Sequence, residues 1–146
     1  MATITSSLIG VNLSGYDTTA QFARGTQVMG TDGSLFEYAN TFSSIPAGNA
    51  VGISELGDAS NLTTTLAGTV KKVGVAQVSI AVSCYGWFQR SGVMNVNVLT
   101  SCAKDVLLFT TGTAGFLDDA TISAAVLPGL NLITSTVSAA TIGVCL

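Results

Sequence analysis

Histidine is absent from this sequence of 146 residues, and only 9% of the residues are charged. Histidine is the side chain that most often carries protons in catalysis, because its charge changes near neutral pH. Its absence excludes Ser-His-Asp and Cys-His catalysis in their ordinary forms, together with most catalytic zinc sites. Carboxylates, lysine and cysteine are the reactive groups that remain. We therefore expect a protein that is not an enzyme and that holds no cofactor and no metal.

Basic residues are also few, and they form no signal for nucleic-acid binding. The sequence holds five lysines and arginines and has a formal net charge of −3. There is no basic stripe of the kind that phosphate backbones attract. Lys71 and Lys72 are the only adjacent basic pair, and beside a strand such a pair is typical of a solvated edge that discourages stray pairing. We expect no nucleic-acid partner.

This composition predicts a surface that is poor in charge and rich in apolar groups. Hydrophobic residues make up 48% of the chain, and the charged share is far below the ~25% that is typical of soluble proteins. The mean hydropathy is +0.59. Because monomers rarely expose large apolar patches, we expect partners or further copies of the chain to cover part of this surface. The alternative is a monomer with a neutral surface of serine, threonine and asparagine.

Neither end of the sequence has the pattern of a secretion or membrane signal. Residues 1–16 lack the basic and compact apolar regions of a secretory signal. The last 27 residues, from Ala120, carry no charge, but Pro128, Asn131 and repeated hydroxyl residues interrupt any spanning run. The β-branched residues in this region predict two strands instead, over 130–137 and 141–146. We expect no membrane partner.

The cysteines and the one serine-lysine motif form no recognisable catalytic pattern. Cys84, Cys102 and Cys145 are odd in number and lack metal-ligand spacing, which is typical of reduced core residues in a reducing compartment. Ser101 and Lys104 match the S-x-x-K spacing, but the partner motifs of that enzyme class are missing. A strand end with a solvated lysine is the preferred interpretation. A small hydrolase is therefore the least favoured function.

The acidic residues are equally unspecific. Asp118 and Asp119 are adjacent, but the patterned loop of a calcium site is missing, so a turn or a helix cap is expected there. Asp119 would cap a short helix over 120–125. A glycosidase needs two acids flanking a cleft, and the sequence alone does not pair Glu37, Glu55 or Asp105 in space.

The strongest structural signal is a pair of alternating apolar runs between Val73 and Val98. In the first run, apolar residues over 76–84 alternate with polar ones, as a half-buried strand requires. The second run alternates in the same way over 94–98, and residues 89–92 supply a loop of hairpin length with a glycine. The sequence therefore predicts a β-hairpin over 73–98, with the apolar face of 76–84 in the core.

Turn signals recur along the rest of the chain. Asp32 and Gly33 predict a tight turn between strands over 22–29 and 34–38, because this pair tolerates positive φ. The other expected elements are a turn at 45–48, a strand through 51–53, a surface loop over 55–69, a strand at 106–110 and a turn at 112–115. This pattern predicts an all-β fold, a small β-barrel or compact sandwich with at most one short helix. Residues 1–20 are expected to form an extended N-terminal arm, and residues 21–146 a single β-rich domain.

One aromatic cluster stands out, at Tyr85, Trp87 and Phe88. The parity of a strand places Tyr85 and Trp87 on the face opposite Phe88, so one pair is expected to leave the core that the other enters. Exposed aromatic residues serve as interface anchors or stack on sugars. We predict subunit contacts for Tyr85 and Trp87, with core packing and sugar binding as the alternatives.

Three segments in this order carry a resemblance to a known family: GTQVMGTDGSLFEYA, VGVAQVSIAVSCYGWFQRSG and LLFTTGTAGFLDD. They combine an early hairpin closed by Asp-Gly, a strand that leads to an aromatic turn, and a glycine-rich turn before an acidic pair. Together they resemble the capsid decoration, or cement, proteins of tailed bacteriophages. The resemblance covers roughly residues 20–146.

The resemblance implies a structural virion protein with a β-tulip-like domain, made in the host cytoplasm and bound to the outside of the phage head. It implies homotrimers at local threefold positions that bridge major capsid protein subunits and so stabilise the capsid. The N-terminal arm would lie on the capsid protein by adding a strand to a sheet edge. The predicted capsid contacts are Ile4, Leu8, Ile9, Val11 and Leu13. The alternative function is a phage fibre, spike or carbohydrate-binding module that contacts the host surface.

Overall fold

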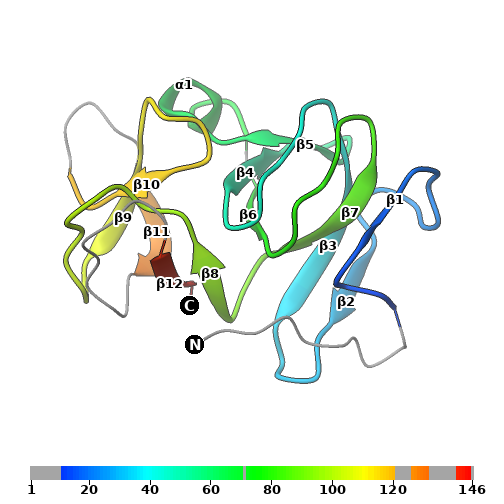
Figure 1. Ribbon diagram of the computed structural model, residues 1–146, viewed down its shortest axis with the longest axis horizontal. Coiled ribbons are helices and arrows are strands. Elements are labelled where there is room, and N and C mark those ends of the chain that lie inside the picture. Colours follow the sequence, from blue (N-terminus) through cyan, green and yellow to red (C-terminus); the bar gives the residue numbers. More distant parts are fainter. Residues whose placement is uncertain (1–10, 71, 121–125, 132–140, 146) are drawn as a thin grey trace.

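The computed structural model describes residues 11–70, 72–120, 126–131 and 141–145, and these residues form two β-sheets and one helical turn (Figure 1). The first sheet has seven strands in the spatial order β1-β7-β6-β4-β5-β3-β2. The second has five strands in the order β10-β9-β11-β12-β8. The prediction of an all-β fold with at most one short helix is confirmed for the residues described.

The strands of the first sheet are β1 (Tyr16–Asp17), β2 (Gln27–Met29), β3 (Leu35–Thr41), β4 (Ala50–Ile53), β5 (Asp58–Asn61), β6 (Lys72–Ala76) and β7 (Tyr85–Gln89). Those of the second sheet are β8 (Val93–Val96), β9 (Leu107–Thr110), β10 (Leu117–Asp118), β11 (Val126–Asn131) and β12 (Thr141–Cys145). The helix is α1 (Thr64–Ala67), between β5 and β6.

Five strands of the first sheet close into a barrel. β3 pairs in parallel with β5 and antiparallel with β7, where Tyr38 lies opposite Trp87. β4 and β6 complete the ring between β5 and β7. β1 lies outside the ring against the start of β7, and β2 lies outside it against β3. Closure pairs the edges of the barrel strands with one another, so β2 is left as an outer strand.

The barrel is filled by side chains and has no lumen. Gly74 and Gly86 occupy two inward positions, and the space that a Cβ would need there is taken by Phe88 and Ile80. The bulk of those two side chains explains why glycine stands at these strand positions. The buried core in the barrel consists of Ala39, Ile45, Val51, Ile53, Ala59, Ala76, Ile80, Cys84 and Phe88.

The second sheet packs against the outside of the barrel, and the two share a core. Ala50 and Val75 belong to barrel strands, and Met94 and Val96 to β8. An isolated bridge from Val98 to Leu117 joins the continuation of β8 to β10, the far strand of the same sheet. The shared core consists of Ala50, Leu62, Val75, Met94, Val96, Val98, Cys102, Leu108 and Leu117.

The predicted hairpin over 73–98 is wrong in its extent. β6 does pair with β7, with Ala76 opposite Phe88, but the strand ends at Ala76 and residues 77–84 form the loop. Ser83 has a φ of 58°, which interrupts an extended strand. Residues 89–92 make no hairpin turn, because the side-chain amide of Gln89 donates to the carbonyls of Ser91 and Val93 and β8 crosses to pair with β12.

Other local predictions met mixed outcomes. The hairpin around Gly33 is confirmed: this glycine has a φ of 86°, although β2 begins at Gln27 rather than at Phe22. The surface loop predicted over 55–69 is wrong, because this stretch contains β5 and α1. The hydroxyl of Thr63 caps α1 by accepting from the N–H of Leu66. The helix predicted over 120–125 falls on residues that, apart from Ala120, lie outside those described.

Candidate functional site

A buried carboxylate with two cations closes one end of the barrel. Glu37 points inward from β3 and its side chain is fully buried. Its Oε1 accepts from Lys72 Nζ at 2.8 Å and its Oε2 from Arg90 at 2.5 Å. Burial by itself raises the pKa of Glu37, but the hydrogen bonds and charges of Lys72 and Arg90 outweigh it and hold this pKa below its ordinary value. The carboxylate is therefore ionised at neutral pH.

This ion trio, formed by Glu37, Lys72 and Arg90, stabilises the barrel and offers no reactive group. Arg90 Nε also donates to the carbonyl of Val73 at 2.9 Å, which fixes the guanidinium across the barrel end. The expectation that Lys72 marks a solvated edge is therefore wrong, because its ammonium group forms an ion pair with the buried carboxylate of Glu37. Lys71 lies outside the described residues.

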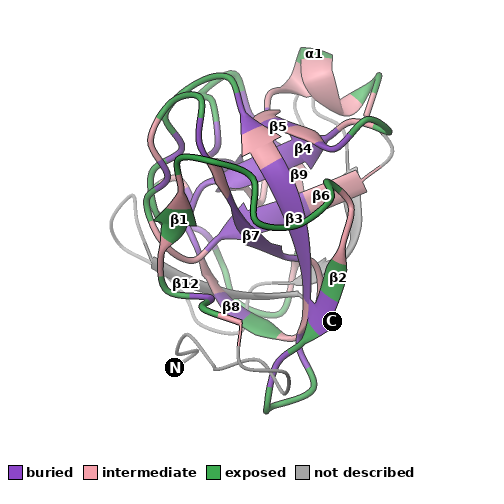
Figure 2. Ribbon diagram, turned by 90° about the vertical axis from the view of Figure 1, so that its right-hand side faces the viewer, coloured by how far each residue is buried: buried purple, intermediate pink, exposed green. Residues whose placement is uncertain are grey.

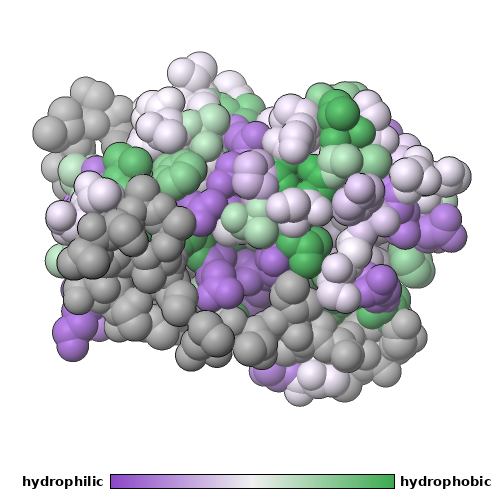
Figure 3. Space-filling model, in the orientation of Figure 1, coloured by the Kyte–Doolittle hydropathy of each residue, from purple (hydrophilic) through white to green (hydrophobic). Residues whose placement is uncertain are grey.

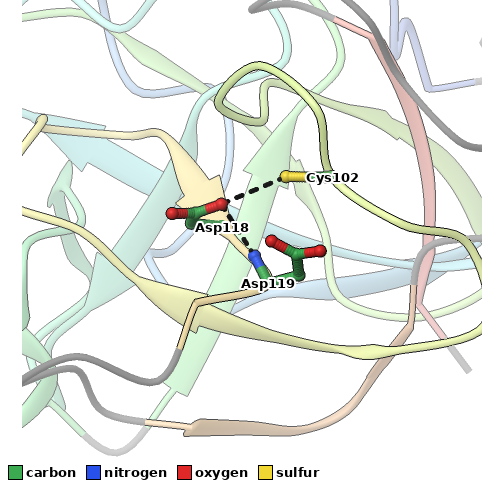
Figure 4. A group of neighbouring side chains, drawn as sticks. All are labelled: Cys102, Asp118 and Asp119. Atoms are coloured by element: carbon green, nitrogen blue, oxygen red, sulfur yellow. Dashed lines mark hydrogen bonds between the residues drawn. The ribbon is translucent and has the colours of Figure 1, made fainter.

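A second cluster of titratable groups joins Cys102, Asp118 and Asp119, whose ligand atoms lie within 4.8 Å of one another (Figure 4). The thiol of Cys102 donates to Asp118 Oδ1 at 3.3 Å, and Asp119 Oδ2 accepts from the N–H of Ala103 at 2.8 Å. Burial first, and then the hydrogen bond to Asp118 and the charges of both aspartates, raise the pKa of Cys102 to about 11. A protonated thiol is not a nucleophile at neutral pH. The geometry is that of a turn held by its own side chains.

The S-x-x-K pair is not assembled into a catalytic unit. Ser101 and Asp105 both have positive φ in the exposed loop before β9, so no helix brings Lys104 next to the serine hydroxyl. Lys104 Nζ lies 3.8 Å from Asp105 Oδ2, and both side chains are mostly exposed. This agrees with the interpretation of a solvated lysine.

An aromatic cluster covers the outer face of β3 and β7. Tyr38 packs against Trp87, Tyr85 stacks on Tyr38 at 6.0 Å, and Phe22 stands edge-on against both Tyr38 and Trp87. The Tyr38 hydroxyl donates to Asp17 Oδ2 at 2.6 Å. Burial, followed by this hydrogen bond, raises the pKa of Tyr38 to about 12. The parity prediction is confirmed, since Phe88 lies in the barrel and Trp87 on its outside.

The predicted contact residues lie at different depths. Trp87 is 2% exposed and Leu13 is 3% exposed, and both pack inside the same core cluster, with Val11 at its margin. Trp87 therefore adds almost nothing to the protein surface. Two neighbouring aromatic side chains do reach the surface: Tyr85 is half-buried, and Phe22 is partly exposed. Ile4, Leu8 and Ile9 lie outside the described residues. The contact roles of all these residues stay predictions.

Sequence reasoning missed an apolar tip at the other end of the barrel, made by Phe42 and Val82. These side chains are 64% and 55% exposed. Phe42 follows Thr41 and Val82 precedes Ser83. The N–H of Ser83 donates to the carbonyl of Thr41 at 2.9 Å, which joins the two loops. The apolar residues on the surface above the β3–β4 and β6–β7 loops appear as green atoms at the upper right of Figure 3. Phe42 belongs to no periodic run, so no pattern in the sequence indicated it. Val82 belongs to the apolar face of 76–84 that was predicted to lie in the core, and this prediction is wrong for Val82.

The apolar tip is rigidly built. The buried Thr41 hydroxyl donates to the carbonyl of Ala81 at 2.8 Å, and the N–H of Thr41 donates to the carbonyl of Cys84 at 2.8 Å. Ile45 and Ile80 bridge the two loops below the tip. The backbone that carries the exposed hydrophobic side chains is thus held by hydrogen bonds before any partner arrives, which lowers the entropy cost of ordering the loops on binding.

The described residues include no helix of the length and apolar character needed to cross a membrane. Comparison with known proteins gives no relative: no protein-family model, no curated protein and no solved structure matches this chain.

Proposed function

We propose that this chain is a structural virion protein that binds the outside of a phage head and stabilises it by bridging major capsid protein subunits. The observation that carries the proposal is the rigid apolar tip of Phe42 and Val82, displayed on a chain with few charges. Exposed apolar groups of this kind favour a surface that is covered in an assembly. Because residues 20–146 resemble capsid decoration proteins in sequence, we infer that this assembly is a phage head.

In this proposal the N-terminal segment and the barrel end act as separate contacts. Leu13 anchors the chain in the aromatic cluster. The predicted capsid contacts that precede it in the sequence, Ile4, Leu8 and Ile9, would bind the capsid protein. A homotrimer at a local threefold position would repeat each contact three times. Repetition raises the effective concentration of every further contact, so that individually modest contacts hold the protein on the shell.

The test is sedimentation of the purified chain with mature heads of its own phage. We expect the full chain to sediment with the heads, and both the double variant Phe42→Ser with Val82→Ser and a variant lacking residues 2–9 to bind at least tenfold more weakly, since losing apolar anchors at an interface centre typically costs about 2 kcal/mol or more. Leu56→Ser, at an exposed site in another loop, serves as the matched control. Failure of the full chain to bind the heads would refute the proposal.

The exposed aromatic residues support a second candidate function, a fibre, spike or carbohydrate-binding module. In the aromatic cluster, Phe22 is partly exposed and Tyr85 is half-buried. Aromatic rings on a surface stack on the apolar faces of sugars. Glycan-array binding that disappears in Tyr85→Ala, with the fold retained, would favour this candidate over the first.

A further inference from the structure

β2 is the outermost strand on one side of the first sheet, and it lies at the margin of the molecule in Figure 2. On its inner side, Tyr38 N donates to the carbonyl of Thr26 and Gly30 N to that of Ser34. In an antiparallel ladder the main-chain groups of successive residues alternate between the two sides. The N–H and C=O groups of Gln27 and Met29 therefore point away from the sheet.

Both outer strands of the second sheet are covered by described residues. At β8, the side-chain amide of Gln77 donates to the carbonyl of Asn95 at 3.0 Å and its Oε1 accepts from Asn95 N at 3.1 Å, so a side chain stands where a further strand would pair. At β10, the bridge to Val98 takes the outer side. No described residue pairs with the outer side of β2.

β2 is short, with the sequence Gln-Val-Met, but it lacks the charged residues and the proline that block pairing at many edge strands. It contains no lysine, no proline and no charge, and Met29 is 52% exposed. An uncharged strand edge with outward N–H and C=O groups is a template for pairing with another strand. Among the described residues, nothing covers the outer side of β2, in contrast to β8 and β10.

We propose that β2 pairs with β2 of a second copy, antiparallel, across a twofold axis at Val28. In this register Gln27 lies opposite Met29 of the second copy, and the two exchange both of their main-chain hydrogen bonds on each side of the axis. The pairing is self-complementary, as an isologous interface requires. It joins the two barrel sheets into one continuous sheet.

The charges flanking β2 favour a second copy over an unrelated strand. Arg24 precedes the strand and Asp32 follows it, each four residues from Val28. Arg24 and Asp32 lie in the turns that flank β2, so an antiparallel partner brings turns of opposite charge near each other at both ends of the contact. Arg24 is exposed and already bound to Asp58 on one side. The acid beside Gln27, Glu37, adds no repulsion because the ion trio neutralises it. This contact does not depend on the proposed function, and shell binding is measured separately from it.

The first test is the mass of the purified full chain by light scattering. We expect an even number of copies for the parent and half that mass for Met29→Lys, whose lysine occupies the open edge. Leu107→Lys, at another exposed strand position, is the matched control and should keep the parental mass. A parent with one copy or with an odd number of copies, or an unchanged mass of Met29→Lys, would overturn the proposal.

The second test is a cross-link that reports the register itself. The paired residues 27 and 29 of the two copies would have Cα atoms about 5.5 Å apart, within the ~4.4–6.8 Å that a disulfide spans. The double variant Gln27→Cys with Met29→Cys should form a covalent dimer on mild oxidation, and neither single variant should do so. Equal yields from the single and double variants, or none from the double, would exclude this register.

Discussion

Replacing Glu37 by glutamine tests the ion trio that closes the barrel. The substitution keeps the shape of the side chain and removes the charge that Lys72 and Arg90 face. Removing one partner of a buried ion pair costs about 3–5 kcal/mol. Lys72 and Arg90 keep 34% and 22% of their side-chain surfaces exposed, so water compensates part of the loss. We expect the free energy of unfolding to fall by about 2–3 kcal/mol.

The effect should depend on pH in a defined direction. The pKa of Glu37 is held below its ordinary value of 4.5 in the folded chain. Its carboxylate therefore stabilises the fold fully above that value, and the stabilisation is lost as the pH falls through the lower folded-state pKa. The difference between the parent and Glu37→Gln should be largest near neutral pH and should shrink on acidification below about pH 4.

Urea unfolding followed by circular dichroism at several pH values measures this difference. Near neutral pH, the expected loss corresponds to a decrease of about 6–12 °C in Tm for a chain of this size. Asp105→Asn is the control, because its ion pair with Lys104 is exposed and its left-handed backbone suits asparagine. A loss for Glu37→Gln that is as small as that for the control, or that is independent of pH, would refute the stabilising role of the trio.

Three further substitutions test the packing and hydrogen bonds of the barrel. Gly86→Ala places a Cβ against Ile80, and overpacking of this kind should lower stability by about 1–3 kcal/mol in thermal unfolding; an unchanged Tm would show that Ile80 yields. Tyr38→Phe removes the hydrogen bond to Asp17 and should cost about 1 kcal/mol. In the parent, the raised pKa of Tyr38 should make stability decline between about pH 10 and 12, and an absorbance titration at alkaline pH should show one fewer late-titrating tyrosine in the variant. Thr41→Val removes the hydroxyl that ties the two loops, so amide exchange at Ser83 should accelerate while β3 stays protected; equal protection in both proteins would contradict the rigid tip.

The all-β fold was predictable because the signals for it are local. Asp32 and Gly33 specify a turn through backbone conformation alone. The alternation of apolar and polar residues indicates the strands β6 and β7 in the part where they pair. The course of residues 77–98 was not predictable, because it depends on the Gln89 side chain and on pairing of β8 with β12, which is distant in sequence. α1 was not predicted because a helix of four residues is too short to show a periodic pattern in the sequence.

The site was less predictable than the fold. Parity correctly separated Trp87 from Phe88, but it did not reveal that β1, Leu13 and Phe22 cover the outer face of β7. Lys72 appeared solvated because Glu37, its partner, is 35 positions away in the sequence. Contacts between distant residues decide which apolar side chains stay exposed, and a single sequence does not encode them in any local pattern.

The pairing of β8 with β12 has a consequence for the order in which the chain acquires its structure. The barrel is complete in residues up to Gln89, whereas β8 has no strand partner until residues 141–145 have been synthesised. On the ribosome, the barrel can therefore form before β12, the strand partner of β8, has been synthesised. A nascent chain stalled before Thr141 would carry a finished barrel joined to β8 without its strand partner, and an unpaired strand edge of this kind favours aggregation.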